Sequence, residues 1–310
     1  MSALRRRIRR VVRVVLCCVA LHAGAAAAQH AVAITIDDLP RGGDGGPRDL
    51  AAVRDLTQRL LAPLREQRIP VIGFVNAGRA MDFGSDGLLE VLGLWLDAGA
   101  DLGNHSYSHP NINHVPLADF TADITRGEPV VRAALAARGR VLKYFRHPFL
   151  FTGPTPEIKA GLQSFLDSHG YTVAPVTIDD ADYEFAALYT RPELSERVRA
   201  EYVPYMESVV AFFEQRGVEV VGHEFPQILL IHASALNADA MPDLLAMFRR
   251  RGYEFVSLDV ALRDDAYRLP DAYVGRGGFS WIHRWSKTKG MPPRGEPEPP
   301  AWVSAAYAAR

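Results

Sequence analysis

The sequence predicts a single α/β domain in which parallel strands form an irregular barrel of seven β/α units. Short runs rich in β-forming residues alternate with longer runs of helical periodicity along most of the 310 residues. Several helical runs begin with a capping residue or an early proline and end near glycine. A composition of 48% hydrophobic and 23% charged residues excludes disordered, collagen-like and coiled-coil proteins.

The elements are expected in a regular order along the chain. Strands are predicted at 31–36, 71–75, 100–103, 141–145, 172–178, 227–231 and 253–258. Helices are predicted between them, at 50–67, 88–98, 117–137, 156–169, 192–216 and 240–250. Repeated β-α units imply a parallel sheet, and seven strands favour an irregular barrel, with an open sheet as the alternative.

The first 28 residues have the pattern of a cleaved secretory signal. Six arginines precede an apolar run at 14–21, and an alanine-rich stretch follows. A spanning helix needs about 20 apolar residues, so a retained membrane anchor is the alternative rather than the expectation. Both cysteines, Cys17 and Cys18, would leave with the signal. We therefore expect an exported chain without disulfides, in a bacterial periplasm or secreted.

The chain is expected to have three parts and few kinds of partner. After the signal peptide at 1–28, we predict one folded domain at 29–286 and a loose Pro-rich tail at 287–310. The net charge of −1 gives no basic footprint, so nucleic acid is not an expected partner. No stable membrane insertion is expected after signal cleavage, and the oligomeric state stays open.

Two clusters of polar residues follow the first and third predicted strands. The first strand ends in adjacent carboxylates, Asp37 and Asp38, before a glycine-rich loop at 41–46. Because successive strand residues point to opposite faces, the two carboxylates can serve two roles; a turn or helix cap is the alternative. After the third strand, His105 and His109 are spaced to share one cation. Two histidines and one aspartate suit a catalytic metal site with open positions.

Three later strands also end in chemically active side chains. Arg146 emerges from an apolar strand and is followed by His147-Pro148, so it could hold a carboxylate, with a salt bridge at the barrel rim as the alternative. A run of acids at 179–182 follows the fifth strand and could equally be a solvated loop. His232 ends the sixth strand; taken alone, it would more often be a core histidine than a catalyst.

Taken together and in this order, these motifs resemble the polysaccharide deacetylases, the NodB-like carbohydrate esterases of family 4. The resemblance extends over the mature chain to about Leu262. It is carried by Thr35-Ile36-Asp37-Asp38, His105-Ser106-Tyr107-Ser108-His109, Arg146-His147-Pro148-Phe149, Asp179-x-x-Asp182-Tyr183 and Leu230-Ile231-His232. By this resemblance, residues 29–286 are the catalytic domain.

The resemblance implies a metal centre with an adjacent base. Asp38, His105 and His109 would bind a divalent metal, by default zinc, with cobalt, nickel or manganese as alternatives. Asp37 would be the general base that deprotonates a metal-activated water, and Arg146 would orient Asp37. The three ligands must therefore converge within coordination range of one ion.

The same resemblance implies the acid and the substrate groove. His232 would be the general acid, oriented by Asp182, and the backbone amide of Phe149 would help hold the oxyanion. Tyr183 and Leu230 would line the groove. Two departures concern that groove: this chain has Leu150 where the family usually has glycine, and Tyr183 where it usually has tryptophan.

The implied activity is removal of acetyl groups from a cell-envelope or extracellular polysaccharide. N-acetyl groups are favoured over O-acetyl groups, and the glycan itself stays open. A metal-dependent hydrolase of a small cyclic or ureido amide is one alternative. A catalytically silent glycan-binding protein is the other.

Overall fold

A parallel seven-stranded sheet forms the centre of the computed structural model, which describes residues 30–310. The predicted signal segment therefore lies outside the described residues. Along the sheet the order is β5-β4-β3-β2-β1-β6, and β7 pairs with the start of β1. The strands are β1 Ala31–Leu39, β2 Val71–Val75, β3 Asp101–Asn104, β4 Tyr144–Phe145, β5 Thr172–Val173, β6 Gln227–His232 and β7 Glu254–Phe255. Each predicted strand overlaps one of these.

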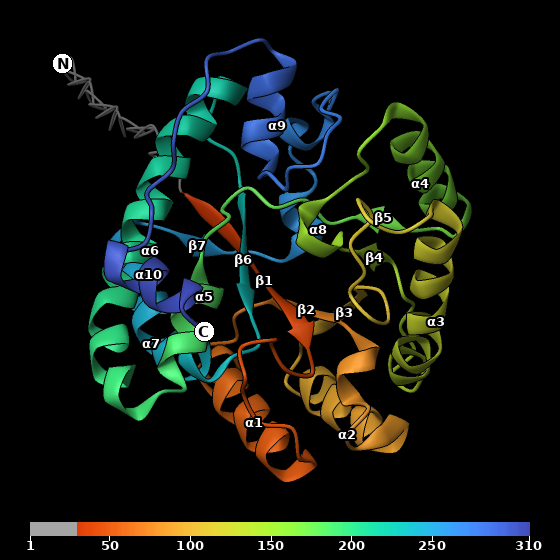
Figure 1. The fold of residues 1–310 in the computed structure, drawn as a ribbon, viewed down its shortest axis with the longest axis vertical. Helices are drawn as coiled ribbons and strands as arrows, with labels where there is room; N and C mark the ends of the chain where they lie inside the picture. The colour runs from red at the N-terminus through yellow and green to blue at the C-terminus, as the bar shows by residue number, and fades with distance from the viewer. Residues whose placement is uncertain (1–29) are drawn as a thin grey trace, which may run out of the picture.

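The sheet curls so that its two ends approach each other (Figure 1). The chain beyond β5 forms a parallel bridge from Ile178 to Leu229 of β6, and the Leu230 amide donates to the Ile178 carbonyl at 3.1 Å. Strand β1 lies between β2 and β6, and eight of its nine residues are buried. The predicted irregular barrel is thus confirmed as a curled parallel sheet in a single domain.

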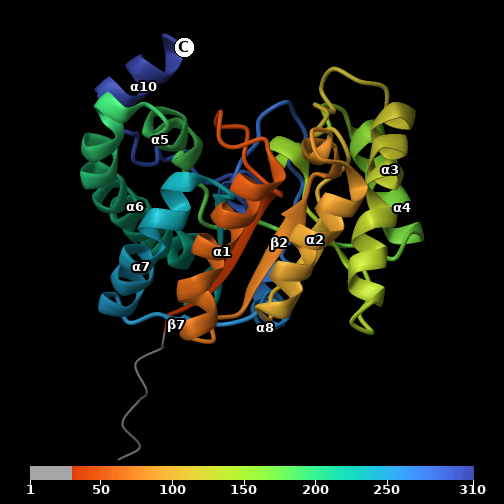
Figure 2. The ribbon, with the colours of Figure 1, turned by 90° about the horizontal axis from the view of Figure 1, so that it is seen from below.

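Helices cover the outside of the curled sheet (Figure 2). The six predicted helices all form, as α1 Leu50–Glu66, α2 Gly84–Asp97, α3 Leu117–Ala136, α4 Pro156–Ser168, α6 Pro192–Val221 and α7 Ala235–Arg250. The shorter helices α5 Asp182–Tyr189, α8 Leu258–Ala261, α9 Trp281–Thr288 and α10 Ala301–Ala308 were not predicted. In residues 30–310, no helix combines the length and the apolar character that crossing a membrane requires.

Side-chain caps fix where several helices begin. A capping side chain accepts a hydrogen bond from a backbone N–H in the first turn of three helices. The caps are Asp49 for α1, Thr155 for α4 and Ser234 for α7. Such a cap satisfies one of the amides that the helix cannot pair internally. Because Ser234 follows β6 by two residues, its cap makes a tight turn from β6 into α7 at the edge where polar side chains gather.

The Pro-rich segment at 287–310 is packed at both of its ends, which differs from the expectation of a loose tail. Its start lies within α9, and α10 packs against α5. Val303 is fully buried, and the Trp302 indole donates to Glu201 at 2.7 Å while the Arg197 guanidinium lies 3.9 Å from the indole ring centre. The prolines rule out regular structure only over 292–300; the apolar side chains beyond them supply the burial that holds the segment.

Candidate active site

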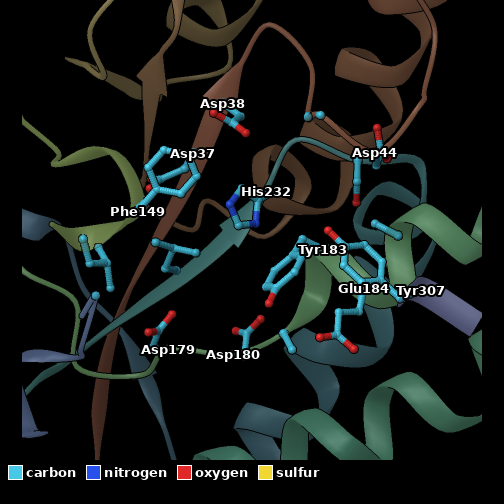
Figure 3. A pocket seen from close by; sticks show the side chains of 18 of the residues that line it. Asp37, Asp38, Asp44, Phe149, Asp179, Asp180, Tyr183, Glu184, His232 and Tyr307 are labelled. Carbon is cyan, nitrogen blue, oxygen red and sulfur yellow. The ribbon is translucent and has the colours of Figure 1, made fainter. Parts of the chain in front are cut away.

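A cavity of about 660 Å³ opens at the C-terminal ends of the strands. Figure 3 shows its lining, with Asp37 and Asp38 on β1, His232 at the end of β6, and Tyr183 and Glu184 on α5. Eight of the ten predicted site residues line this cavity. The other two, Arg146 and Asp182, are fully buried and bond to residues that line it or lie beside it. Parallel sheets gather functional side chains at this edge because all strand ends meet there.

A bulge near the end of β1 brings both aspartates to the cavity. The pairing register of β1 with β2 shifts between Ile36 and Leu39, and Asp38 has a left-handed backbone with φ of 66°. Strand alternation predicted opposite faces for the two carboxylates. Instead, Asp37 Oδ2 lies 3.7 Å and Asp38 Oδ1 lies 3.8 Å from Nε2 of His105. Bulges commonly redirect a side chain beside a functional site in this way.

Asp38, His105 and His109 converge as one candidate metal site. Their ligand atoms all lie within 4.8 Å of one another, and Asp38 Oδ1 is 3.8 Å from Nε2 of each imidazole. Nδ1 of His105 lies 2.9 Å from the Arg146 carbonyl, which fixes the ring and directs Nε2 toward Asp38. His109 has a left-handed backbone with φ of 57°, so the two histidines do not sit on a regular helical turn.

The residues present fit a divalent cation. Asp38 Oδ1 is buried without a hydrogen-bond partner, which is costly for a carboxylate unless a ligand occupies its free lone pairs. Burial lowers the pKa of both His105 and His109, so both imidazoles are neutral and available as ligands near pH 7. One carboxylate oxygen and two imidazole nitrogens are donors that zinc and similar borderline metals accept.

Arg79 is a site residue that the sequence analysis missed. It follows β2, in the 3₁₀ turn Ala77–Ala80, and its Nη2 donates to Asp38 Oδ2 at 2.7 Å. Burial raises the pKa of Asp38, but Arg79 and the histidines outweigh it and lower this pKa to about 2. The guanidinium thus occupies one carboxylate oxygen and leaves the other for a metal. Its position directly after a strand was the signal that could have identified it.

Asp37 and Arg146 form a buried pair beside the metal site. Asp37 is only 1% exposed, and its Oδ2 lies 3.6 Å from Nη1 of Arg146. Arg146 Nη2 donates to Thr35 Oγ1 at 2.8 Å, which ties the arginine to the same face of β1. Burial raises the pKa of Asp37 to about 6, with Arg146 acting in the opposite direction. A carboxylate with that pKa is ionised at pH 7 yet can accept a proton.

His232 is held by a network that reaches into α7 and α6. Its Nδ1 lies 2.6 Å from Asp182 Oδ1, and its backbone N–H donates to Asp182 Oδ2 at 2.8 Å. Asn237 donates to Asp182 Oδ2 at 2.6 Å and accepts a bond from the Tyr202 hydroxyl at 2.6 Å. Burial alone would lower the pKa of His232, but Asp182 raises it to about 10. Asn237 and Tyr202 belong to no sequence motif and were not predicted.

The predicted groove residues face the cavity, and one departure from the family pattern has a structural counterpart. Phe149 and Leu150 both have left-handed backbones with φ of 56°, so Leu150 adopts a conformation that glycine normally favours. The Phe149 ring packs edge-on against His109, with ring centres 4.3 Å apart. Tyr183 lies edge-on to His232, and Leu230 lines the cavity beside them.

The sequence of this chain is similar to known proteins over about half its length, and its fold is similar to solved structures over most of its length. The family model described as polysaccharide deacetylase matches residues 24–173. A chitin deacetylase from Colletotrichum lindemuthianum is 27% identical over 128 residues, which are 41% of this chain and 48% of that protein. The chain therefore spans about half the length of this curated relative.

Solved structures share the fold at low sequence identity. A polysaccharide deacetylase from Bacillus cereus is 18% identical with a TM-score of 0.53, covering 74% of this chain and 92% of that chain. A peptidoglycan deacetylase from Bacillus subtilis is 20% identical with a TM-score of 0.50, covering 77% and 93%. A carbohydrate esterase family 4 pseudoenzyme from Bacillus anthracis is 17% identical with a TM-score of 0.50, covering 76% and 66%.

Proposed function

This chain belongs to the polysaccharide deacetylase family, and from that premise we propose that it is a metal-dependent hydrolase that removes acetyl groups from a glycan. The observation that carries the proposal is that Asp37 and His232 face the same cavity as the candidate metal site, with the buried Asp182 bonded to His232. A base and an acid beside a Lewis-acid site form the set that hydrolysis of an unreactive amide requires.

Asp38, His105 and His109 are the residues that would hold the metal. A divalent cation there would supply a Lewis acid that polarises the acetyl carbonyl and activates water. Zinc is the first choice, and cobalt, nickel and manganese suit the same donors. Arg79 keeps the Asp38 carboxylate ionised and oriented for this role.

Asp37 is proposed as the general base. It lies 3.7 Å from His105 Nε2, so a water near the metal site would be within its reach. Arg146 orients the carboxylate and opposes its protonation, because its guanidinium is buried and paired with Asp37. A positioned base of this kind contributes roughly 10²–10⁴-fold to a rate.

His232 is proposed as the general acid that protonates the departing amine. Because Asp182 raises the pKa of His232 to about 10, the imidazole carries its proton at neutral pH. The backbone amide of Phe149 is proposed to donate to the oxyanion, in the loop that packs over His109. Tyr183 and Leu230 are proposed to contact the substrate beside His232.

The proposed substrate is a cell-envelope or extracellular polysaccharide that carries N-acetyl groups. A predicted export signal would deliver the chain to such glycans, and the similar proteins from C. lindemuthianum and B. subtilis are described as chitin and peptidoglycan deacetylases. Hydrolysis of an amide depends on protonation of the leaving nitrogen more than hydrolysis of an ester depends on protonation of the leaving oxygen. A strongly protonated His232 therefore favours N-acetyl over O-acetyl groups.

The test is acetate release from oligomers of N-acetylglucosamine, acetylated xylan and a cyclic imide, with zinc supplied. We expect acetate from the N-acetylglucosamine oligomers, loss of activity on chelation and recovery with added metal. Opening of the imide without acetate release would favour the small-amide hydrolase instead. Glycan affinity without acetate release from any substrate would favour a silent binding protein.

A further inference from the structure

One wall of the cavity is strongly acidic. Six carboxylates line it and are called the acidic wall here: Asp44, Asp179, Asp180, Glu184, Glu296 and Glu298. They come from the glycine-rich loop after β1, the chain around the start of α5, and the segment that precedes α10. In Figure 3, Asp44 and Glu184 lie on the opposite side of His232 from Asp38 and Phe149.

The acidic wall has no lysine or arginine paired with it in the described residues. Within residues 30–310, no lysine or arginine forms an ion pair with any of its six carboxylates. Two arginines lie on the cavity lining: Arg79 pairs with Asp38, and Arg310 stacks on the Tyr307 ring without forming an ion pair with a wall carboxylate. Glu296 has only His283 nearby, at 3.8 Å, and burial lowers the pKa of that imidazole. Only His232 and, at Asp179, Arg146 oppose this charge from a distance, so the six carboxylates are compensated only in part.

Asp44, in the acidic wall, has a buried carboxylate oxygen without a hydrogen-bond donor. Its side chain is only 9% exposed, and Oδ1 accepts a hydrogen bond from the Gly46 amide at 3.0 Å. Its other oxygen, Oδ2, is buried and has no hydrogen-bond partner, and the same holds for Oδ2 of Asp180. A buried carboxylate oxygen without a donor costs free energy unless a ligand supplies one.

Mutual repulsion among these groups also favours a cationic ligand. Partial burial, together with the charges of Asp179 and Glu298, raises the pKa of Glu296 to about 7. Burial likewise raises the pKa of Asp179 to about 6, against the opposing charges of His232 and Arg146. A positive charge placed among these carboxylates would relieve their repulsion.

From this arrangement we propose that the acidic wall binds a primary ammonium group of the substrate. The enzyme then prefers an acetamido group that has a free amine nearby. The inference rests on the proposed deacetylation and specifies its substrate. Two sources supply this chemistry: a partly deacetylated aminosugar oligomer and a monoacetylated aliphatic diamine.

An organic ammonium suits the acidic wall better than a second metal ion. In the part of the chain that the structure describes, the only group of ligand atoms close enough to hold a metal is Asp38, His105 and His109. The wall carboxylates do not converge on one point in that way. They are spread over three segments, as recognition of an extended, cationic substrate requires.

Binding of a glucosamine tetramer tests the inference without turnover, because this probe has amines but no acetyl groups. Calorimetry should show binding that weakens as salt is raised. Asp44→Asn and Glu296→Gln should each raise Kd by roughly two- to fivefold, the range expected for loss of one ion pair in a cavity open to solvent. The matched control is Glu66→Gln, which removes an exposed acid at the end of α1 and should leave Kd unchanged.

Kinetics then distinguish the two amine sources. We compare kcat/KM for a disaccharide of N-acetylglucosamine and glucosamine, the fully acetylated disaccharide, and N-acetylputrescine. At least a tenfold preference for one amine-bearing substrate over the fully acetylated one is expected. Glu298→Gln should reduce that preference through KM, with kcat retained. Because Glu298 is exposed, this variant should fold even if Asp44→Asn does not.

Failure of the inference and failure of the proposed function give different results. The inference is overturned if acetate is released with no preference for an amine-bearing substrate and the variants do not weaken tetramer binding. Deacetylation would still stand in that case. If tetramer binding depends on the acidic wall but no substrate releases acetate, deacetylation is refuted and the ammonium site is retained.

Discussion

Replacing Asp182 with asparagine should move the alkaline limb of the pH–rate profile down by about three pH units. His232 must be protonated to act as an acid, so activity falls as the pH rises through its pKa. In the unaltered protein, Asp182 raises that pKa from 6.5 to about 10. Without the carboxylate, the chief stabiliser of the imidazolium is gone.

The hydrogen bonds around Asp182 strengthen this expectation. Its Oδ2 accepts from both the His232 N–H and the Asn237 amide, so an asparagine would keep its oxygen there and turn its NH₂ toward His232 Nδ1. The asparagine NH₂ and a protonated Nδ1 of His232 are both donors, so they would repel each other. The contact is favourable only when Nδ1 has lost its proton. If the pKa returns to 6.5, the protonated fraction of His232 at pH 8 falls from about 99% to about 3%, a loss of roughly 30-fold. At pH 6 the loss from deprotonation is only about 1.3-fold.

The assay is initial-rate acetate release between pH 5 and 10 on variant and unaltered protein, both with measured metal content. Asp167→Asn, an exposed change of the same kind on α4, is the control and should leave the profile in place. If Asp182→Asn lowers the rate equally at every pH, then Asp182 does not govern the proton of His232, and the assignment of His232 as the acid loses its support.

Three further results are expected. His105→Ala or His109→Ala should reduce bound zinc from about one ion per chain to near zero by metal analysis, because two ligands hold the ion poorly; full occupancy would refute the site. Asp37→Asn should keep the metal but lower kcat by roughly 10²–10⁴-fold, and loss of the metal would instead make Asp37 a ligand. Asn237→Ala should cost about 2 kcal/mol of stability, since Asp182 and Tyr202 each lose a hydrogen-bond partner. A thermal scan should show Tm lower by about 3 °C, and no change would mean that the network is not structural.

The fold and the metal-site geometry could be predicted because both depend on short-range patterns. Each strand is a brief apolar run followed by a turn, so its C-terminal end is visible in the sequence. In a parallel sheet these ends share one edge, which brings Asp38 close to His105 and His109 although they are far apart along the chain. That convergence was the central expectation, and it is confirmed.

The remaining parts of the site depend on packing that no local pattern encodes. Strand alternation placed Asp37 and Asp38 on opposite faces, and a bulge overrode it. Asn237 lies in an ordinary amphipathic helix, and only the turn capped by Ser234 brings it to Asp182. The segment at 292–300 has the composition of a linker, yet it is held because residues beyond it bury Val303.

The position of Arg310 on the cavity lining has a practical consequence for anyone who produces this protein. Any chain that continues past this residue, such as an affinity tag or a fused reporter, starts from the cavity lining. A basic tag there would lie close to the carboxylates and compete with incoming ligands. Purification handles should therefore be attached ahead of β1, where the chain enters the domain from the opposite end of the strands.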